Sequence, residues 1–129
     1  LGRKVEIIRE FSENITVEAN QDLLAWVFEN LLKNAAEAID HKEGKITIRT
    51  AKVSHKFALI YVEDNGKGLT SKVRRNLFYP GFTTKKRGWG LGLSLAKRII
   101  EDYHNGKIFV KETQLGKGTT FAIEIPLKN

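Results

Sequence analysis

The chain has 129 residues, of which 41% are hydrophobic and 29% are charged, which is enough for one domain with a single core. Because it has no cysteine, a disulfide framework and any thiolate metal site are excluded, and no apolar run approaches the roughly 18 residues of a membrane span. The net charge of +7 is concentrated, because the stretch between Asp64 and Glu101 holds nine basic residues and no acidic one.

The first third of the chain predicts two short strands followed by a helix. Val5–Phe11 and Asn14–Glu18 are rich in Val, Ile and Thr, which is typical of strands. Asn20 or Asp22 can cap a helix that runs to about Ile39, because apolar residues recur over this stretch at helical spacing.

The middle of the chain predicts an antiparallel hairpin and then a long loop. Alternation from Gly44 to Val53 and the apolar run Lys56–Asp64 indicate two strands joined by a turn. The segment Asn65–Gly92 carries six of the eleven glycines and little periodicity, so we expect a loop with a short helix near Lys72–Leu77. A loop of this length in a compact domain is usually functional.

The last part of the chain predicts a second long helix and two strands. Leu91–Tyr103 has helical spacing, and Lys107–Glu112 and Thr119–Pro126 are strand-like segments on either side of a glycine turn at 116–118. Helices that cover one face of a mostly antiparallel sheet make a two-layer sandwich. We therefore expect an α/β (α+β) two-layer sandwich, and the lack of a repeat or linker favours one domain over residues 1–129.

A polar stripe on the first predicted helix is a candidate ligand set. Asn30, Asn34 and Glu37 are spaced by four and three residues, so they share one stripe beside the apolar one. A neutral amide oxygen near phosphate oxygens is a suitable hard ligand for a hydrated Mg²⁺. Taken alone, however, the stripe is better explained as a solvated polar face.

Three glycine-containing segments are further candidates. DNGKGL at 64–69 follows an apolar strand, where a carboxylate can accept a hydrogen bond from an amino group such as that of adenine. GWGLGL at 88–93 runs into a helix, whose first N–H groups can bind a phosphate, although a lone pattern of this kind is weak. GKGTTF at 116–121 lies between two strands and, like the first segment, could by itself be only a turn.

Together and in this order, these segments resemble the ATP-binding catalytic domain of sensor histidine kinases, in the superfamily shared with gyrase, MutL-type repair proteins and heat-shock chaperones. ENLLKNAAEAI is similar to the family's N box, DNGKGL to its G1 box, LFYPGFTTK to its F box, GWGLGLSLAKRII to its G2 box and GKGTTF to its G3 box. The resemblance covers essentially the whole chain. It implies a mixed, mostly antiparallel sheet of about five strands, with three helices on one face and an ATP lid loop.

The resemblance also implies a role for each matching position. Asn34 would coordinate Mg²⁺ with assistance from Asn30. Asp64 would read the adenine amino group, with Gly68 and Thr119 completing that pocket, partly through water. Lys85 would reach the terminal phosphate from the lid. The ATP-binding residues implied in this way are Asn30, Lys33, Asn34, Asp64, Gly66, Gly68, Thr84, Lys85, Gly88, Gly90, Leu91, Gly92, Leu93 and Thr119.

The implied reaction is phosphoryl transfer. ATP-hydrolysing members of the superfamily place a water-activating Glu where this chain has Asn30, and an amide cannot act as a general base at neutral pH. This difference argues against a self-contained ATPase and for transfer of the terminal phosphoryl group to a histidine. Asn30 and Lys85 would support the transition state, and Phe78 and Phe82 would anchor a lid that spans about residues 70–88.

The acceptor histidine is expected outside this chain. His41, His55 and His104 do not lie in the helical His-Glu or His-Asp setting of a family phosphoacceptor, so we expect surface or capping roles for them. The chain begins at Leu1 and lacks methionine, which favours a piece of a longer kinase. The implied partners are the kinase's own dimerisation and phosphoacceptor domain and a response regulator receiver domain. The full-length protein would be a homodimer, with this domain in the cytoplasm and an inner-membrane anchor of the parent left open.

Two alternatives follow from the same residues. A basic nucleic-acid-binding module would explain the charge, but it would not explain the glycine pattern, and aromatic residues are not interleaved with the basic ones as stacking platforms. No nucleic-acid partner is therefore expected. A degenerate kinase domain that binds partners without nucleotide is opposed by the intact Asn34, Asp64 and glycines of the G2 box.

Overall fold

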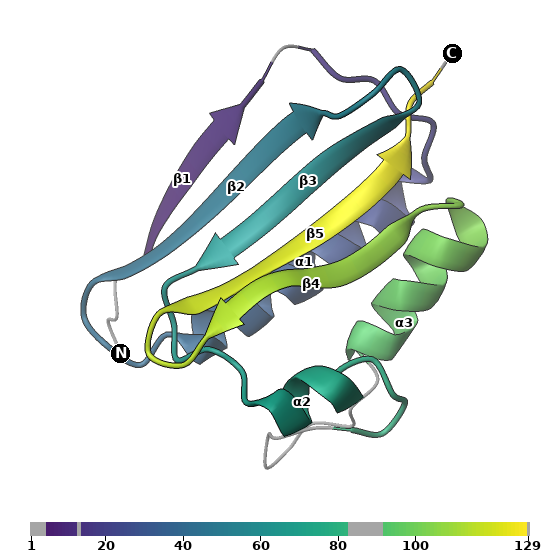
Figure 1. The fold of residues 1–129 in the computed structure, drawn as a ribbon. Coiled ribbons are helices and arrows are strands. Elements are labelled where there is room, and N and C mark those ends of the chain that lie inside the picture. The colour runs from purple at the N-terminus through teal and green to yellow at the C-terminus, as the bar shows by residue number, and fades with distance from the viewer. Residues whose placement is uncertain (1–4, 13, 83–91, 129) are drawn as a thin grey trace.

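The computed structural model describes residues 5–12, 14–82 and 92–128. Figure 1 shows a five-stranded sheet with α1 behind it, α3 beside β4 and α2 beyond the end at which β3 stops. Within the described part of the chain, no helix is long and apolar enough to cross a membrane. The elements are β1 (Val5–Phe11), α1 (Gln21–Ala38), β2 (Gly44–Lys52), β3 (Phe57–Asp64), α2 (Ser71–Asn76), α3 (Gly92–Arg98), a π-helical turn η1 (Ile99–Tyr103), β4 (Lys107–Gln114) and β5 (Gly118–Pro126).

The sheet is mixed and mostly antiparallel. Its strand order is β1-β2-β3-β5-β4, in which β1 and β2 are parallel and the other three pairings are antiparallel. The parallel pair is joined through α1, because parallel neighbours need a crossover connection. The predicted two-layer α/β sandwich is thereby confirmed, and so is the predicted short helix after β3, which runs over Ser71–Asn76.

One apolar core fills the space between the sheet and the helices. The Asn20 side chain caps α1 by accepting a hydrogen bond from the backbone N–H of Leu23 at 3.0 Å, and the helix then buries one residue per turn. The strands contribute alternate residues, because successive side chains of a strand point to opposite faces. The core consists of Val27, Leu31, Ala35, Ile39, Ile46, Val62, Ala96, Ile99, Ile100, Ile108, Phe121, Ile123 and Ile125.

The prediction of a strand over Asn14–Glu18 is wrong. Only Val17 pairs with the sheet, in an isolated bridge to Leu127, and the Thr16 carbonyl accepts a hydrogen bond from the backbone N–H of Lys128. The physical reason is topological. Having left β1, the chain must begin α1 directly after Asn20, so this segment passes the end of β5 without running alongside a strand.

The predicted helix over Leu91–Tyr103 is regular only in its first part. The α-helix ends at Arg98 and continues as the wider turn η1, where Ile99 and Ile100 are buried. His104 closes this turn with a buried ring: Nδ1 donates a hydrogen bond to the Ile99 carbonyl at 2.8 Å, and Nε2 accepts one from the Asn20 N–H at 3.0 Å. His104 therefore has the capping role expected for it, and it also ties α3 and η1 to the start of α1.

We expect the change His104→Ala to destabilise the domain by about 2 kcal/mol, because it leaves the partly buried Asn20 N–H and the buried Ile99 carbonyl without their partner. Urea unfolding measures this effect. His55→Ala is the matched control, since His55 is exposed in the turn between β2 and β3 and its removal should change the free energy of unfolding little. Equal losses in the two variants would contradict the bridging role of His104.

Candidate functional site

Asp64 is a buried carboxylate at the end of β3. Its side chain is 6% exposed, and Oδ1 accepts a hydrogen bond from the Gly66 N–H at 2.9 Å. Burial raises the pKa of Asp64 above its ordinary value, because desolvation outweighs the stabilising backbone hydrogen bonds from Gly66 and Thr119, and the charge of Glu63 adds to the rise. A carboxylate held at the end of a strand in this way can accept a hydrogen bond from an amino group of a ligand.

Thr119 on β5 lies directly opposite Asp64. The two residues are register partners, so their side chains point to the same face of the sheet, and Thr119 is 5% exposed. The Thr119 hydroxyl lies 2.8 Å from the hydroxyl of Thr113 on β4. The structure thus brings the G1 and G3 boxes together and adds Thr113, which lies in neither box and which the sequence-based prediction missed.

Two glycines allow the G1 loop and the β4–β5 turn to pack backbone against backbone. Gly68 has a φ of +78°, and a Cβ there would overlap the carbonyl oxygen of Gln114. Gly118 has a φ of +128°, and a Cβ there would overlap the carbonyl oxygen of Asp64. Both positions therefore require glycine for two reasons: their backbone conformation has a positive φ, and a Cβ would overlap a carbonyl oxygen.

The N box meets the G2 box through Asn30. Asn30 Nδ2 donates a hydrogen bond to the Trp26 carbonyl at 2.9 Å, which leaves Oδ1 on the other side of the amide. A Cβ on Gly92, at the start of α3, would lie 2.8 Å from this Oδ1. Asn34, one turn further along α1, is half-buried, whereas Lys33 is exposed.

The G1 loop also rests on the end of α1. The Lys67 N–H donates to the Ala38 carbonyl at 2.9 Å, and a Cβ on Gly66 would lie 2.5 Å from the same oxygen. Gly66 is therefore explained by packing against the helix. Because Asn34 lies one turn before Ala38, this contact holds the N box beside the loop that follows Asp64.

Asn65 is a second residue whose role the sequence did not indicate. Its Oδ1 accepts from the Lys45 N–H and its Nδ2 donates to the Glu43 carbonyl, both at 2.8 Å. The ring Nε2 of His41 lies 2.8 Å from the Asn65 carbonyl oxygen. Asn65 thus fastens the α1–β2 connection to the G1 loop, and His41 has the surface role expected for it.

The F box begins with a packed aromatic ring. Phe78 meets Phe121 edge-on, with 6.5 Å between ring centroids, and the Lys97 ammonium lies 5.7 Å from the centre of the Phe78 ring. The Arg74 guanidinium donates a hydrogen bond to the Val110 carbonyl at 3.1 Å. Lys97 and Arg74, two of the nine basic residues between Asp64 and Glu101, therefore take part in packing α2 and the F box. Phe82, the second predicted anchor of the lid, is half-buried.

Five of the predicted ATP-binding residues, Thr84, Lys85, Gly88, Gly90 and Leu91, lie outside the described residues. The other two predicted positions in this region, Gly92 and Leu93, belong to the first turn of α3, where Leu93 packs against the core.

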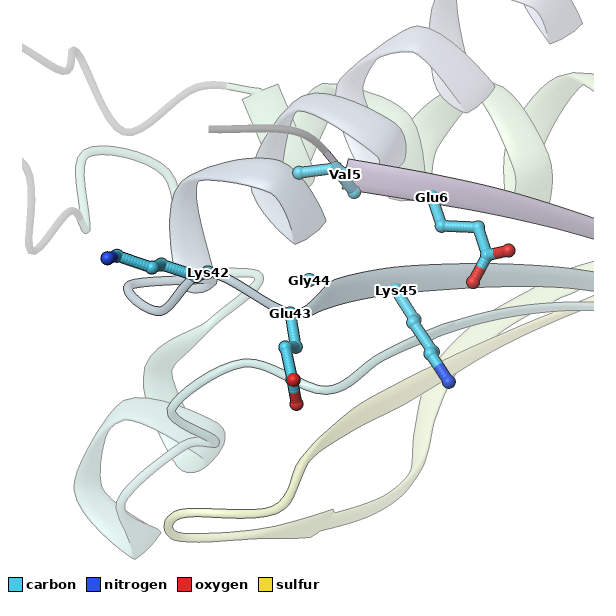
Figure 2. Close-up of a pocket in the computed structure, with 6 residues that line it drawn as sticks. All are labelled: Val5, Glu6, Lys42, Glu43, Gly44 and Lys45. Atoms are coloured by element: carbon cyan, nitrogen blue, oxygen red, sulfur yellow. The ribbon is translucent and has the colours of Figure 1, made fainter. Parts of the chain in front are cut away.

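A surface depression lies beside the start of β1 and β2 (Figure 2). It contains none of the predicted site residues, and its charged side chains, two acidic and two basic, extend away from the backbone toward solvent. Such mixed charge favours no particular ligand. The residues that line it are Val5, Glu6, Lys42, Glu43, Gly44 and Lys45.

Comparison with protein families gives a match over residues 19–129 to the family described as histidine kinase-, DNA gyrase B-, and HSP90-like ATPase. The chain is 39% identical to the signal transduction histidine-protein kinase AtoS of Escherichia coli over 125 residues, which are 96% of this chain and 20% of AtoS. It is 36% identical to sporulation kinase C of Bacillus subtilis, with 92% of this chain and 27% of that protein covered. The chain thus spans about a fifth to a quarter of these relatives.

Solved structures of the same kind share the fold. The catalytic domain of histidine kinase ThkA superposes with a TM-score of 0.82 at 35% identity, covering 95% of this chain and 78% of that one. A crystal structure of ThkA in complex with the response regulator protein TrrA matches with a TM-score of 0.79 at 32% identity, over 96% of this chain and 34% of that one.

Proposed function

Because the chain belongs to the histidine kinase-, DNA gyrase B- and HSP90-like ATPase family, as an ATP-binding catalytic domain of the sensor histidine kinase type, we propose that it binds Mg-ATP and donates the terminal phosphoryl group to a histidine of a separate acceptor domain. Residues 1–129 form one domain in this proposal. The parent protein is a two-component sensor kinase in this proposal, and this domain binds the ATP that the kinase uses.

The convergence of the N, G1, G2 and G3 boxes is the observation that supports this proposal. Asp64 and Thr119 face the same side of the sheet, and the contact of Gly92 with Asn30 brings the start of α3 to α1. This arrangement favours a nucleotide whose base lies on Asp64 and whose phosphates extend toward the start of α3. There, backbone N–H groups of the G2 box stabilise negative charge.

The amide side chains of α1 fit a hydrated Mg²⁺. Asn34 and Asn30 lie one turn apart on the same stripe of the helix, and neutral amide oxygens combine well with phosphate oxygens around this ion. The ion would neutralise charge on the phosphates when bound. In the proposal Asn34 is the principal ligand and Asn30 assists. Lys33 and Lys85 would supply positive charge, as the resemblance implies, and Lys85 lies outside the described residues.

Replacing Asn34 with Ala is expected to weaken ATP binding about tenfold in the presence of Mg²⁺, since one ligand of the ion is lost. In EDTA the variant and the unchanged protein should bind ATP with similar affinity. Titration calorimetry under the two conditions measures the difference. The exposed Asn14 provides the control variant Asn14→Ala, which should match the unchanged protein in both. A loss of the same size in EDTA would contradict the role of Asn34 as a metal ligand.

The reaction is transfer to an acceptor rather than hydrolysis. Asn30 occupies the helix position at which a water-activating carboxylate would be needed, and its Nδ2 donates to the Trp26 carbonyl. An amide held in this way cannot take a proton from water. The imidazole of an acceptor histidine is itself a nucleophile, so the domain contributes positioning and charge stabilisation.

Labelled ATP tests this proposal. The domain is incubated with γ-labelled ATP alone, and then with a separately purified acceptor domain from a kinase of the same type. We expect acid-labile label on the acceptor only when both are present, and none on an acceptor whose histidine is replaced by Gln. Release of free phosphate by the domain alone, at the rate of an ATPase, would contradict the proposal.

The partners follow from this chemistry. The domain works with the dimerisation and phosphoacceptor domain of its own kinase, and the phosphoryl group passes on to a response regulator receiver domain, as the complex formed by ThkA suggests. The full-length protein is a homodimer in this proposal, and the domain lies in the cytoplasm, where ATP is available.

A further inference from the structure

Three polar side chains form a row across three neighbouring strands. Asp64 on β3 is the register partner of Thr119 on β5, and Thr119 is in turn the register partner of Thr113 on β4. Residues that face each other across a sheet point to the same side, so all three lie on the face that carries the helices. Thr113 is therefore the outermost member of a row that begins at the proposed adenine-reading carboxylate.

A β-bulge brings Thr113 into this row. Val110 pairs with Phe121 and faces the core, but the next paired residue on β4 is Glu112, opposite Thr120, so Lys111 is the extra residue. Without the bulge, Glu112 would face inward opposite Thr119, and Thr113 would point to the other face. Arg74 donates a hydrogen bond to the carbonyl of Val110 at the start of the bulge. Bulges of this kind redirect side chains beside functional sites.

The Thr113 hydroxyl has three polar neighbours and one proton. Its oxygen accepts a hydrogen bond from the Leu69 N–H at 2.9 Å, which uses one lone pair. Its distance to the Thr119 oxygen is 2.8 Å, which is usual for hydroxyl pairs, whereas its distance to the Gly118 carbonyl is 3.3 Å. Either hydroxyl can be the donor across the shorter contact, and the Gly118 carbonyl is a second acceptor for the Thr113 proton. Of the two hydrogen bonds that Thr113 can donate, the one to Thr119 has the shorter distance.

We propose that Thr113 is a positioning residue that makes Thr119 a hydrogen-bond donor toward the nucleotide base, and so favours adenine over guanine. When Thr113 donates to Thr119, one lone pair of the Thr119 oxygen is used and the Thr119 proton remains available to the base. The inference rests on the proposed ATP binding and deepens it. Thr113 reaches the base only through Thr119, from outside the five family motifs.

The two purines differ at the atoms concerned. Adenine has an amino group that Asp64 can bind and a ring nitrogen, N1, that accepts a hydrogen bond directly or through a water. Guanine has a carbonyl oxygen in place of that amino group and an N–H at N1. A donor hydroxyl at Thr119 therefore matches adenine and opposes guanine, whereas a freely rotating hydroxyl would present a lone pair to either.

The test compares the Kd values of Mg-ATP and Mg-GTP. Thr113→Val keeps the shape of the side chain and removes the hydroxyl, and we expect the preference for ATP to fall by about five- to tenfold. Thr113→Ser should keep the preference. Adding Thr113→Val to Thr119→Val should change the preference no further, because Thr113 acts through Thr119. Thr47→Val, a threonine exchange on β2 outside this row, is the matched control.

Loss of the Leu69 hydrogen bond also loosens the G1 loop after Gly68, but the N–H groups of Gly66 and Thr119 still hold Asp64. This loosening is therefore expected to weaken both nucleotides alike and to leave their ratio unchanged. An unchanged ratio in Thr113→Val would therefore overturn the inference. If Thr113→Val does not fold, the unchanged protein still decides: ATP with carbon in place of N1 should bind about fivefold more weakly, and equal binding would overturn the inference. Failure of the unchanged protein to bind any nucleotide would instead refute the proposed function.

Discussion

Replacing Asp64 with Asn is expected to weaken Mg-ATP binding by about 100-fold or more without destabilising the domain. Asn can still accept a hydrogen bond from the Gly66 N–H, but its amide would turn a donor toward the adenine amino group or toward the Thr119 N–H. Loss of this acceptor leaves the amino group of the bound adenine without a hydrogen-bond partner in a buried site, which lowers the affinity for ATP strongly. Binding should therefore collapse while the fold persists.

The difference in stability between this variant and the unchanged protein should depend on pH in a defined direction. Burial raises the pKa of Asp64 above its ordinary value of 3.8, so the proton is bound more tightly in the folded state than in the unfolded state. The stability that this proton contributes is fully present below 3.8 and is lost as the pH rises through the folded-state pKa. Asn does not titrate, so the Tm of the variant should gain on that of the unchanged protein across this window and level off above it.

Titration calorimetry and thermal melts from acidic to neutral pH measure the two effects. Asp40→Asn removes an exposed carboxylate just beyond α1 and serves as the control, with ATP binding retained. An Asp64→Asn variant that binds ATP as tightly as the unchanged protein would remove Asp64 from the site. A variant that loses stability relative to the unchanged protein as the pH rises would contradict the raised pKa.

Replacing Gly118 with Ala is expected to cost about 3 kcal/mol or more of stability. The residue has a φ of +128°, which L side chains rarely adopt, and its Cβ would overlap the Asp64 carbonyl. The only relief is to separate β5 from the G1 loop, which would also move the row that contains Asp64 and Thr119. ATP binding should therefore fall together with stability.

Gly116 offers a matched control in the same turn. It has a φ of +78°, but no atom lies within 4 Å of the position of its Cβ. Gly116→Ala should therefore pay only for the backbone conformation, about 1 kcal/mol. Urea unfolding of the two variants separates steric overlap from backbone strain, and equal losses would show that the approach of Gly118 to Asp64 is not what requires glycine there.

Elements with strong periodicity could be predicted from the sequence. The 18-residue helix α1 repeats its apolar residues at helical spacing, and the β2–β3 hairpin shows strand-like runs bounded by turn residues. The segment Asn14–Glu18 has the composition of a strand, but its neighbours in space are decided by the path from β1 to α1. Local composition cannot encode that path, and it also could not show that the turn after Arg98 widens around His104.

The candidate site was predictable where a role is local to a motif. Asp64, Gly68 and Gly118 stand in short segments whose turn chemistry is visible in the sequence. Thr113 was missed because its role depends on the pairing of β4 with β5. A signal for it exists, since counting outward from Gly116 in the turn places residue 113 opposite residue 119. Asn65 was missed because its partners lie about 20 residues away, in the α1–β2 connection.

Direct titration of the unchanged protein with Mg-ATP tests the central claim most simply. The account predicts saturable binding of ATP and ADP at millimolar concentration or below, which weakens when EDTA removes Mg²⁺ and is lost in Asp64→Asn. A folded sample, verified by its thermal melt, that shows no binding of either nucleotide at millimolar concentration would contradict the account.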